Sequence, residues 1–379
     1  RGTGCALALS DAMWAVLEGE RSHHEYSVRV RGVGATGGPV GESAPITIEL
    51  ADEAVTGGLY FWSTEPAAIH RYDFDRARRQ AEVFYDSTDA GGHCVGCHAL
   101  SRDGRTIAIG YGTTGPIAIV DVATRVSAQM LTGEMSAFSP DASELVIGGI
   151  PERGAVRPLS IVRADGTGAA IDLGTGTAPD WSPDGDTIVA TRDDGALVRR
   201  DRAAGGAWSA GTPLTDGAAF DQFAAFAPDS EWIAFSRVTP SDGPGGIESR
   251  VWALARDGRA ARLLARASAG TLDSMPRWSP TTFLHGGSRL FWITFTSNMP
   301  YGVEPGGSRR RTIWMAAFQP GSSDPDPSRP AFRLPQQPET GSSFIPQWTS
   351  TVERQTCDVP SECRAGETCM DGVCVPDLI

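Results

Sequence analysis

The sequence contains no lysine, and its 33 basic residues are all arginines. Acidic residues outnumber them, so the formal net charge is −13 at pH 7. A surface of this charge repels phosphate groups, which argues against nucleic acid and anionic lipid as partners. No apolar run approaches the roughly 20 residues that a membrane-spanning helix needs. The chain begins with Arg1 and shows no signal peptide, so we expect a processed or trimmed chain.

The motifs of several enzyme classes are also missing. No glycine-rich phosphate loop stands between a strand-like and a helix-like run, and no G-x-S-x-G nucleophile elbow occurs. The stretch DPDPS at 324–328 lacks the Gly and the distal Glu of an EF-hand, and predicts a loop stiffened by proline. Long helical periodicity is absent too. With 45 glycines and 26 prolines, the sequence predicts a turn-rich, all-β protein.

A short box recurs along the chain as FSPD, WSPDG, FAPD and WSP, with weaker copies LSRDG and QWTS. The first apolar residues of the boxes are Leu100, Phe138, Trp181, Phe226, Trp278 and Trp348. The shortest step between copies is 38 residues and the longest is 70, which is typical of propeller blades with loop insertions in the longer gaps. Ser-Pro-Asp-Gly suits a type I turn. A short apolar run follows each box from 100 to 278, which predicts blades of four strands.

The two ends of the repeat region complement each other. Residues 58–86 contain three strand-like runs with no box before them, whereas almost nothing but a cysteine-rich tail follows the last box. The simplest assembly uses residues 344–352 as the inner strand of a blade whose outer strands are 58–86. The sequence therefore predicts a six-bladed β-propeller closed by strands from both ends, with few open sheet edges.

The box followed by an aliphatic strand resembles the TolB-like family of six-bladed propellers, over about residues 58–352. This family includes periplasmic interaction modules and the propeller domains of some peptidases. A peptidase would need a separate hydrolase domain, for which the sequence has no motif. The resemblance implies a fold and says little about function.

We expect three parts in the chain. Residues 1–55 form a partial immunoglobulin or fibronectin type III-like β segment, residues 56–353 the propeller, and residues 354–379 a disulfide-rich tail. The strand-like runs of the first part lie at 13–17, 26–30 and 45–50. Such a sandwich needs about seven strands, so residues outside this chain or a neighbouring subunit would complete it. The alternative is a few hairpins packed on the side of the propeller.

Four of the seven cysteines crowd the tail: Cys357, Cys363, Cys369 and Cys374. They predict two disulfides, with three possible pairings. A zinc cluster is the alternative, although no close C-x-x-C pair occurs there. Disulfides indicate an oxidising compartment, so we expect a periplasmic or extracellular protein of the bacterial cell envelope. Cys5 has no evident mate within the chain.

The stretch HCVGCHALSRDG at 93–104 joins a C-x-x-C-H motif to the first box. In such a motif two thiols add to the haem vinyl groups and the following His binds the iron. We therefore predict one covalent haem c, with thioethers at Cys94 and Cys97 and the proximal ligand at His98. A thioredoxin-type pair would need a βαβ setting, and a zinc ribbon a second C-x-x-C. The remaining alternative is a buried reduced pair beside an unrelated His.

The repeat alignment gives this haem a location. Cys97 lies three residues before its box, and the matching positions are Met135, Ala178, Phe223, Met275 and Ile345. All five are apolar, so we expect a collar at the mouth of the channel that shields a haem face from water.

Several residues are candidates for the remaining contacts of the haem. Met275 is the first candidate for the distal iron ligand. The lower-ranked candidates are Met135, Met299 and His70, and an open or water-bound position is also possible. For the propionates we expect arginines near the mouth, namely Arg102, Arg105 and Arg277.

Together these features predict an extracytoplasmic mono-haem c-type cytochrome that passes single electrons to redox partner proteins, within a larger assembly. One alternative is a propeller scaffold for protein–protein interaction with a structural haem. The other is an enzyme with an open haem site, such as a peroxidase.

Overall fold

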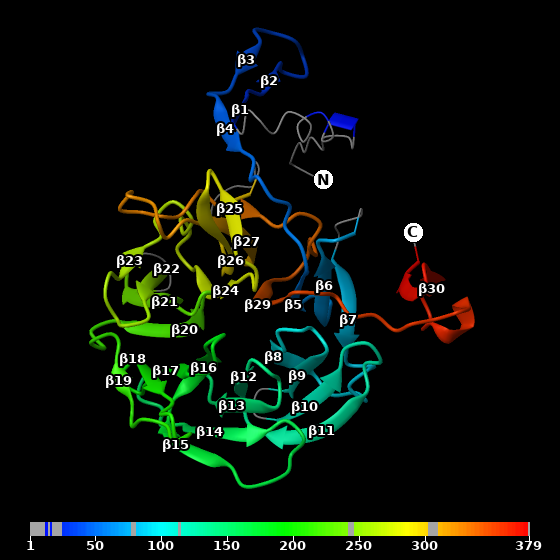
Figure 1. The fold of residues 1–379 in the computed structure, drawn as a ribbon. Helices are drawn as coiled ribbons and strands as arrows, with labels where there is room; N and C mark the ends of the chain where they lie inside the picture. The colour runs from blue at the N-terminus through cyan, green and yellow to red at the C-terminus, as the bar shows by residue number, and fades with distance from the viewer. Residues whose placement is uncertain are drawn as a thin grey trace.

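The computed structural model describes residues 12–13, 16, 25–76, 81–112, 115–241, 246–301 and 310–377. Regular structure in these residues is almost entirely β-strand, and six large sheets surround a central channel as blades (Figure 1). The predicted six-bladed propeller is confirmed. No helix in these residues is long and apolar enough to cross a bilayer.

The first three blades follow one another along the chain, and each runs outward from the channel as a four-stranded meander. Blade 1 contains β8 (Val95–Leu100), β9 (Thr106–Tyr111), β10 (Pro116–Asp121) and β11 (Ser127–Thr132). Blade 2 contains β12 (Met135–Phe138), β13 (Glu144–Gly148), β14 (Pro158–Arg163) and β15 (Ile171–Thr175). Blade 3 contains β16 (Thr177–Trp181), β17 (Thr187–Thr191), β18 (Leu197–Asp201) and β19 (Thr212–Pro213).

The next two blades keep this order with longer strands. Blade 4 contains β20 (Phe220–Phe226), β21 (Trp232–Pro240), β22 (Ile247–Ala255) and β23 (Arg262–Leu263). Blade 5 contains β24 (Ser274–Trp278), β26 (Ser288–Ser297), β27 (Thr312–Phe318) and β28 (Phe332–Arg333), with β25 (Phe283–His285) added on β26.

Blade 6 joins the two ends of the repeat region, as predicted. Its inner strand is β29 (Ser343–Thr349), and its outer strands are β5 (Gly58–Thr64), β6 (Ala67–Asp73) and β7 (Glu82–Asp86). β29 pairs with β5 in antiparallel register, with Trp348 opposite Leu59. Strands from both ends of the chain therefore close the ring.

The hydrophobic core is divided among the interfaces between neighbouring blades. Tyr60 and Ile69 of blade 6, for example, pack with Val95 and Ile109 of blade 1. Similar clusters join each further pair of neighbours around the ring. Each blade thus buries both of its faces, which explains the short, nearly continuous apolar runs of its central strands.

The recurring box is a turn locked by its serine. In blade 1 the amide of Gly104 donates to the carbonyl of Ser101 at 3.0 Å. The Ser101 hydroxyl donates to Asp103 at 2.7 Å and accepts from the amide of Thr106 at 2.9 Å. Blades 2 and 3 repeat these side-chain contacts with Ser139 and Ser182. The aspartates of the boxes are therefore turn residues.

A β-bulge interrupts the inner strand of five blades shortly before the box, one residue earlier in blade 1 than in the other four. The shifts in pairing lie between Val95 and His98, Thr177 and Asp180, Gln222 and Ala225, Ser274 and Arg277, and Phe344 and Gln347. Blade 2 pairs without a shift. Because an extra residue re-aims the side chains on either side of it, this bulge decides which residues face the channel.

The N-terminal strands form an arm outside the ring (Figure 1). β1 (Glu25–Val28) pairs with β4 (Ile46–Glu49), and β2 (Arg31–Gly32) pairs with β3 (Gly41–Glu42). Within the described residues this is a two-stranded hairpin and not a sandwich. The predicted strand at 13–17 is wrong where it is described, since residues 12, 13 and 16 are helical. An apolar run of this length suits either structure.

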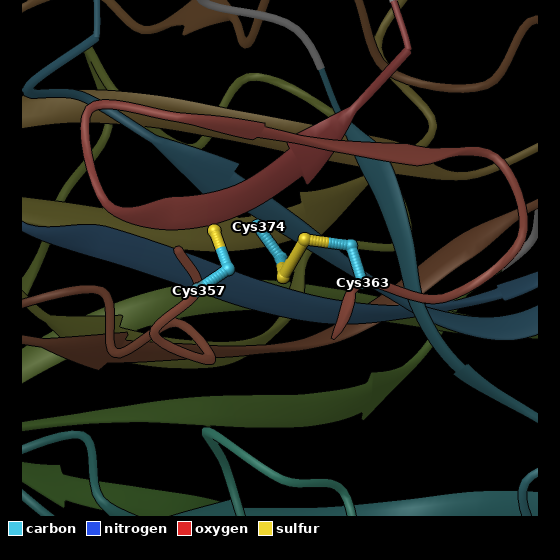
Figure 2. A group of neighbouring side chains, drawn as sticks. All are labelled: Cys357, Cys363 and Cys374. Atoms are coloured by element: carbon cyan, nitrogen blue, oxygen red, sulfur yellow. A yellow bond between two sulfur atoms is a disulfide. The ribbon is translucent and has the colours of Figure 1, made fainter. Parts of the chain in front are cut away.

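The tail is a small disulfide-bonded unit with η2 (Pro360–Glu362), β30 (Glu367–Met370) and β31 (Val373–Pro376). Its bonds join Cys357 to Cys369 and Cys363 to Cys374. Figure 2 shows the second bond with Cys357 beside it. These four sulfurs are thus paired, which confirms the prediction of two disulfides and leaves the zinc alternative unsupported. Cys5 lies outside the described residues.

Ion pairs attach the tail to the propeller near the closing blade. Arg364 contacts Asp89, in the loop between β7 and β8. Glu367 contacts Arg125, in the loop between β10 and β11. The tail therefore bridges blade 1, the first blade to be completed along the chain, and blade 6, the last.

Candidate haem-attachment site

The predicted collar forms, with one exception. Met135, Ala178 and Phe223 make a buried cluster, and Cys97 and Met275 pack against it. Ile345 is buried as well but lies outside this cluster. Residues from five inner strands therefore meet at one level of the channel, although 178 sequence positions separate the first from the last.

The bulge gives the collar an unusual backbone. Ala178, Phe223, Met275 and Ile345 have φ values of 41°, 54°, 57° and 54°. Non-glycine residues with positive φ are uncommon and cost of the order of 1 kcal/mol or more. Cys97 and Met135 do not have positive φ. The backbone at the collar position is thus strained in blades 3 to 6. It is not strained in blade 1, which has Cys97 there, or in blade 2, whose inner strand pairs without a shift.

His98 lies one residue beyond the collar and faces blade 6. It pairs with Ile109, just as Val95 pairs with Tyr111, and these partners belong to the cluster between blades 6 and 1. The corresponding residues of the other blades are Ser136, Pro179, Ala224, Pro276 and Pro346. Blade 1 is therefore the blade that carries an imidazole at this buried position.

The imidazole of His98 is 4% exposed and incompletely bonded. Its Nδ1 lies 3.4 Å from the carbonyl oxygen of Gly96. Its Nε2 is buried and forms no hydrogen bond of suitable distance and angle with a described residue, although the Tyr60 backbone interacts with the ring. Burial lowers the pKa of His98 to about 4, so the ring is neutral at pH 7. A neutral ring that directs Nδ1 to a carbonyl and leaves Nε2 free is the usual state of a metal-ligating histidine.

Both cysteines of the motif are free thiols. Cys94 is exposed, next to His93, whose ring stacks on Tyr111 with centroids 5.2 Å apart. Cys97 is half-buried, and burial raises the pKa of its thiol. The thiol at the collar is therefore protonated at neutral pH, and the outer one is accessible.

The side chains present are those that a covalent haem needs. In the structure, however, the two thiols and the imidazole do not lie on one side of the strand. Two free thiols, a histidine with an unpartnered Nε2 and an apolar collar are what c-type attachment needs. On a helix, residues i, i+3 and i+4 share one face. In β8, Cys97 points to the collar and His98 to blade 6. A haem joined to Cys94, Cys97 and His98 therefore requires residues 93–98 to change their pairing with β9.

The candidate distal ligands occupy three different places. Met275 and Met135 lie in the collar with Cys97. Met299 packs instead against the core between blades 4 and 5. His70 stacks on Phe61, with centroids 5.5 Å apart, and so faces blade 5, on the side of blade 6 away from His98. The structure brings the first two together with the motif, and the identity of the distal ligand stays a prediction.

The predicted propionate partners lie beyond the collar or outside the channel. Arg102 and Arg277 line a cavity of the channel, together with Asp180. An Arg102 Nη donates to the Trp181 carbonyl at 3.2 Å, and an Arg277 Nη to the Pro276 carbonyl at 2.9 Å. Arg105 is exposed and lies 3.6 Å from Glu353. A role for these residues toward propionates stays a prediction.

Sequence reasoning did not single out Asp180. It holds the position just before the box, where the other blades have Ala99, Ala137, Ala225, Arg277 and Gln347. All six line the channel cavity. The repeat alignment could therefore have pointed to Asp180, because this position is uncharged in four blades and holds one acidic and one basic residue in the other two.

Comparison with known proteins identifies the fold. No family model and no curated protein matches the chain. Among solved structures, TolB from Acinetobacter baumannii is similar over 92% of this chain and 88% of its own, with 14% identity and a TM-score of 0.54. This chain has a TolB-like β-propeller fold.

Two other solved structures are similar at lower scores. A protein described as a TolB from Agrobacterium tumefaciens matches 78% of this chain and 99% of its own, with 16% identity and a TM-score of 0.46. Hydrazine synthase from Kuenenia stuttgartiensis matches 61% of this chain and 70% of its own, with 14% identity and a TM-score of 0.37.

Proposed function

We propose that this protein is an extracytoplasmic c-type cytochrome with one covalent haem, which exchanges single electrons with redox partner proteins. Cys94 and Cys97 hold the haem through thioethers, and Nε2 of His98 is the proximal iron ligand. A bound haem supplies one-electron oxidation and reduction. The residues of the chain attach it, fix its iron ligand and exclude water from its face.

The observation that carries the proposal is the unpartnered Nε2 of His98. A buried polar atom without a partner costs about 1–3 kcal/mol. The other blades avoid this cost with Ser136, Pro179, Ala224, Pro276 or Pro346 at the same position. A histidine that accepts such a cost directly after two free thiols is explained by a metal that uses the free nitrogen.

Met275 is the distal ligand we propose, with Met135 next. Both sulfurs belong to the collar that Cys97 joins. Met275 is half-buried and comes from blade 5, two blades round the ring from blade 1, whereas Met135 comes from the adjacent blade. A thioether from a blade that is not adjacent suits a ligand on the iron face opposite His98 better than one from the next blade.

The compartment and the partner follow from the two ends of the chain. The paired cysteines of the tail favour an oxidising compartment such as the periplasm. The arm exposes apolar side chains that a lone hairpin cannot cover, among them Val28, Ile46 and Ile48. A neighbouring subunit that adds strands to this hairpin would bury them, which supports a larger assembly.

The optical spectrum of the reduced protein tests the proposal. The protein is produced in a periplasm that has the machinery for c-type haem attachment. Sharp low-spin bands that do not change with carbon monoxide are expected. A high-spin spectrum that responds to carbon monoxide would favour the peroxidase-like alternative, and the absence of haem bands would reject every cytochrome function. Met275→Ala is expected to lose the low-spin bands, with Met299→Ala as the control that keeps them.

A further inference from the structure

We infer that the central channel contains a binding site for one small monovalent carboxylate, built on Arg277 with Arg102 as its second cation. The site lies beyond the collar, and it is tested in the haem-free protein because its two arginines are also the predicted partners of the haem propionates. Three charged side chains carry the inference, and they line one cavity: Arg102, Asp180 and Arg277.

The cavity holds an excess of positive charge. Two guanidinium groups and one carboxylate line it, among aromatic and small side chains that include Trp181, Trp278 and Trp348. The Asp180 carboxylate accepts a hydrogen bond from the amide of Phe226 at 2.7 Å. In the described part of the chain it forms no ion pair with either arginine. One positive charge therefore remains uncompensated in a poorly hydrated space, where a charge is costly.

Arg277 is the buried donor at the centre of this site. It is 8% exposed, and its one side-chain hydrogen bond to a described residue goes to the carbonyl of Pro276. Two other arginines with little exposure have a carboxylate partner, whereas Arg200 is also buried, pairs with no carboxylate among the described residues and lies outside the cavity. Arg71 lies 2.5 Å from Glu82, and Arg237 forms two bonds to Asp221 at 2.7 and 2.8 Å. Arg277 has the same fork of donors and lacks the carboxylate that completes it.

The electrostatics of the group agree with this assignment. Burial raises the pKa of the Asp180 carboxyl, while Arg277 and Arg102 oppose the rise. Burial also lowers the pKa of Arg277 and of Arg102, and Asp180 opposes that change. The three groups therefore sense one another, and an added anion would relieve the two arginines.

The walls of the cavity define the class of ligand. A planar carboxylate matches the guanidinium fork better than a spherical anion does. The collar bounds the cavity toward Cys97, and the box residues surround it, so that formate or acetate fits better than a long chain. The excess of one positive charge favours a monovalent ligand.

Thermal unfolding of the full chain against sodium formate, with acetate, chloride and sulfate in parallel, tests the site. Formate and acetate are expected to raise the unfolding midpoint in a saturable way. Arg277→Gln is expected to raise the half-saturating concentration roughly tenfold or more. Asp180→Asn is expected to lower it roughly fivefold, because a competing negative charge is removed.

Arg200→Gln is the matched control. Arg200 is 6% exposed, donates to the Thr175 carbonyl at 3.0 Å and lies outside the channel cavity. Its variant is expected to unfold more easily and to keep the formate response unchanged. Should Arg277→Gln not fold, Arg102→Gln and Asp180→Asn decide, with opposite expected shifts. No saturable response in the parent protein, or the same response in Asp180→Asn as in the parent, overturns the inference. Haem content is measured separately, so that a failure here leaves the proposed function untouched.

Discussion

The inner strand of blade 1 and those of the other blades share a backbone plan and differ in chemistry. Each runs along the channel and contributes to the collar or its rim, and in blades 1 to 3 it ends in the serine-locked turn. At the two positions around the bulge, blade 1 has Cys97 and His98 where blade 5, for example, has Met275 and Pro276. Cys97 and His98, together with Cys94 just before them, thus suffice to add a candidate site to one repeat. The fold supplies six equivalent places, and the side chains decide which one carries function.

Blade 1 and the other blades also differ in the kind of unfavourable feature that each contains near the collar. Four blades hold a non-glycine residue at positive φ in the collar, and blade 1 does not. Blade 1 instead buries an imidazole with one unpartnered nitrogen. Backbone strain is therefore a general feature of this repeat. Other blades also bury unpartnered polar atoms, and what distinguishes blade 1 is that its unpartnered imidazole directly follows two free thiols.

Exchange of the distinguishing side chain between two blades gives the largest expected effect. His98→Ser copies Ser136 of blade 2 into blade 1. The thiols still attach a haem, but the low-spin spectrum is lost because the proximal nitrogen is gone. Ser136→His is the control, and its spectrum is expected to equal that of the parent. Low-spin bands retained in His98→Ser would show that the two positions do not differ in function.

Truncation of the first box residue to alanine, in blade 1 and separately in blade 3, compares how much each residue contributes to the core. Trp181 is fully buried and donates to the Gly185 carbonyl at 3.1 Å, whereas Leu100 is smaller and makes no such bond. Trp181→Ala is expected to lower the free energy of unfolding by about 4 kcal/mol and Leu100→Ala by about 3 kcal/mol. Urea denaturation measures both. A larger loss of unfolding free energy for Leu100→Ala than for Trp181→Ala would contradict the view that the core of blade 1 is packed like that of the other blades.

A second buried histidine, away from the motif, sharpens the comparison through pH. Burial lowers the pKa of His70 to about 4. The unfolded chain binds a proton below pH 6.5, whereas the folded protein does so only below about 4. The free energy of unfolding therefore falls as pH decreases from 6.5 to 4, by up to about 3 kcal/mol for this residue.

His70→Gln removes this contribution, so its difference from the parent in urea denaturation is expected to shrink between pH 7 and pH 4. Parallel curves for the two proteins would mean that His70 titrates normally. In the proposed haem-loaded state His98 would bind the iron through Nε2 and would not add to this pH dependence.

The smallest expected effect concerns what the blades have in common. Ser101→Ala and Ser139→Ala each remove the hydroxyl that locks the turn, at a cost of about 1–2 kcal/mol in the free energy of unfolding. The exposed Ser143→Ala is the control, with a change within about 0.5 kcal/mol. The two variants are expected to lower the unfolding midpoint equally. A clear difference between Ser101→Ala and Ser139→Ala would show that the turns of blades 1 and 2 are not equivalent.

Most of the ring could be predicted from the sequence because each blade is a local repeat. The boxes fix the turns, and the strand runs at 58–86 without a box imply the closure by β29. The arm could not be predicted in the same way. Its strand pairing depends on what covers Val28 and Ile48, and the local sequence does not contain that information.

The candidate site was predictable in its members and not in its orientation. The alignment on the boxes placed Cys97, Met135 and Met275 at one level of the channel, and the cluster agrees. It did not reveal that His98 faces blade 6. That outcome depends on the bulge between Val95 and His98, which moves a side chain to another face and leaves the sequence spacing unchanged.

The intact mass of the denatured protein tests the central claim most directly. The chain, produced with the machinery for c-type haem attachment, is unfolded, reduced and weighed by mass spectrometry. The account predicts a mass that exceeds the polypeptide by one haem, and the bare polypeptide mass for Cys94→Ser/Cys97→Ser. A parent protein at the bare polypeptide mass, or a double variant that still carries the haem, would contradict it.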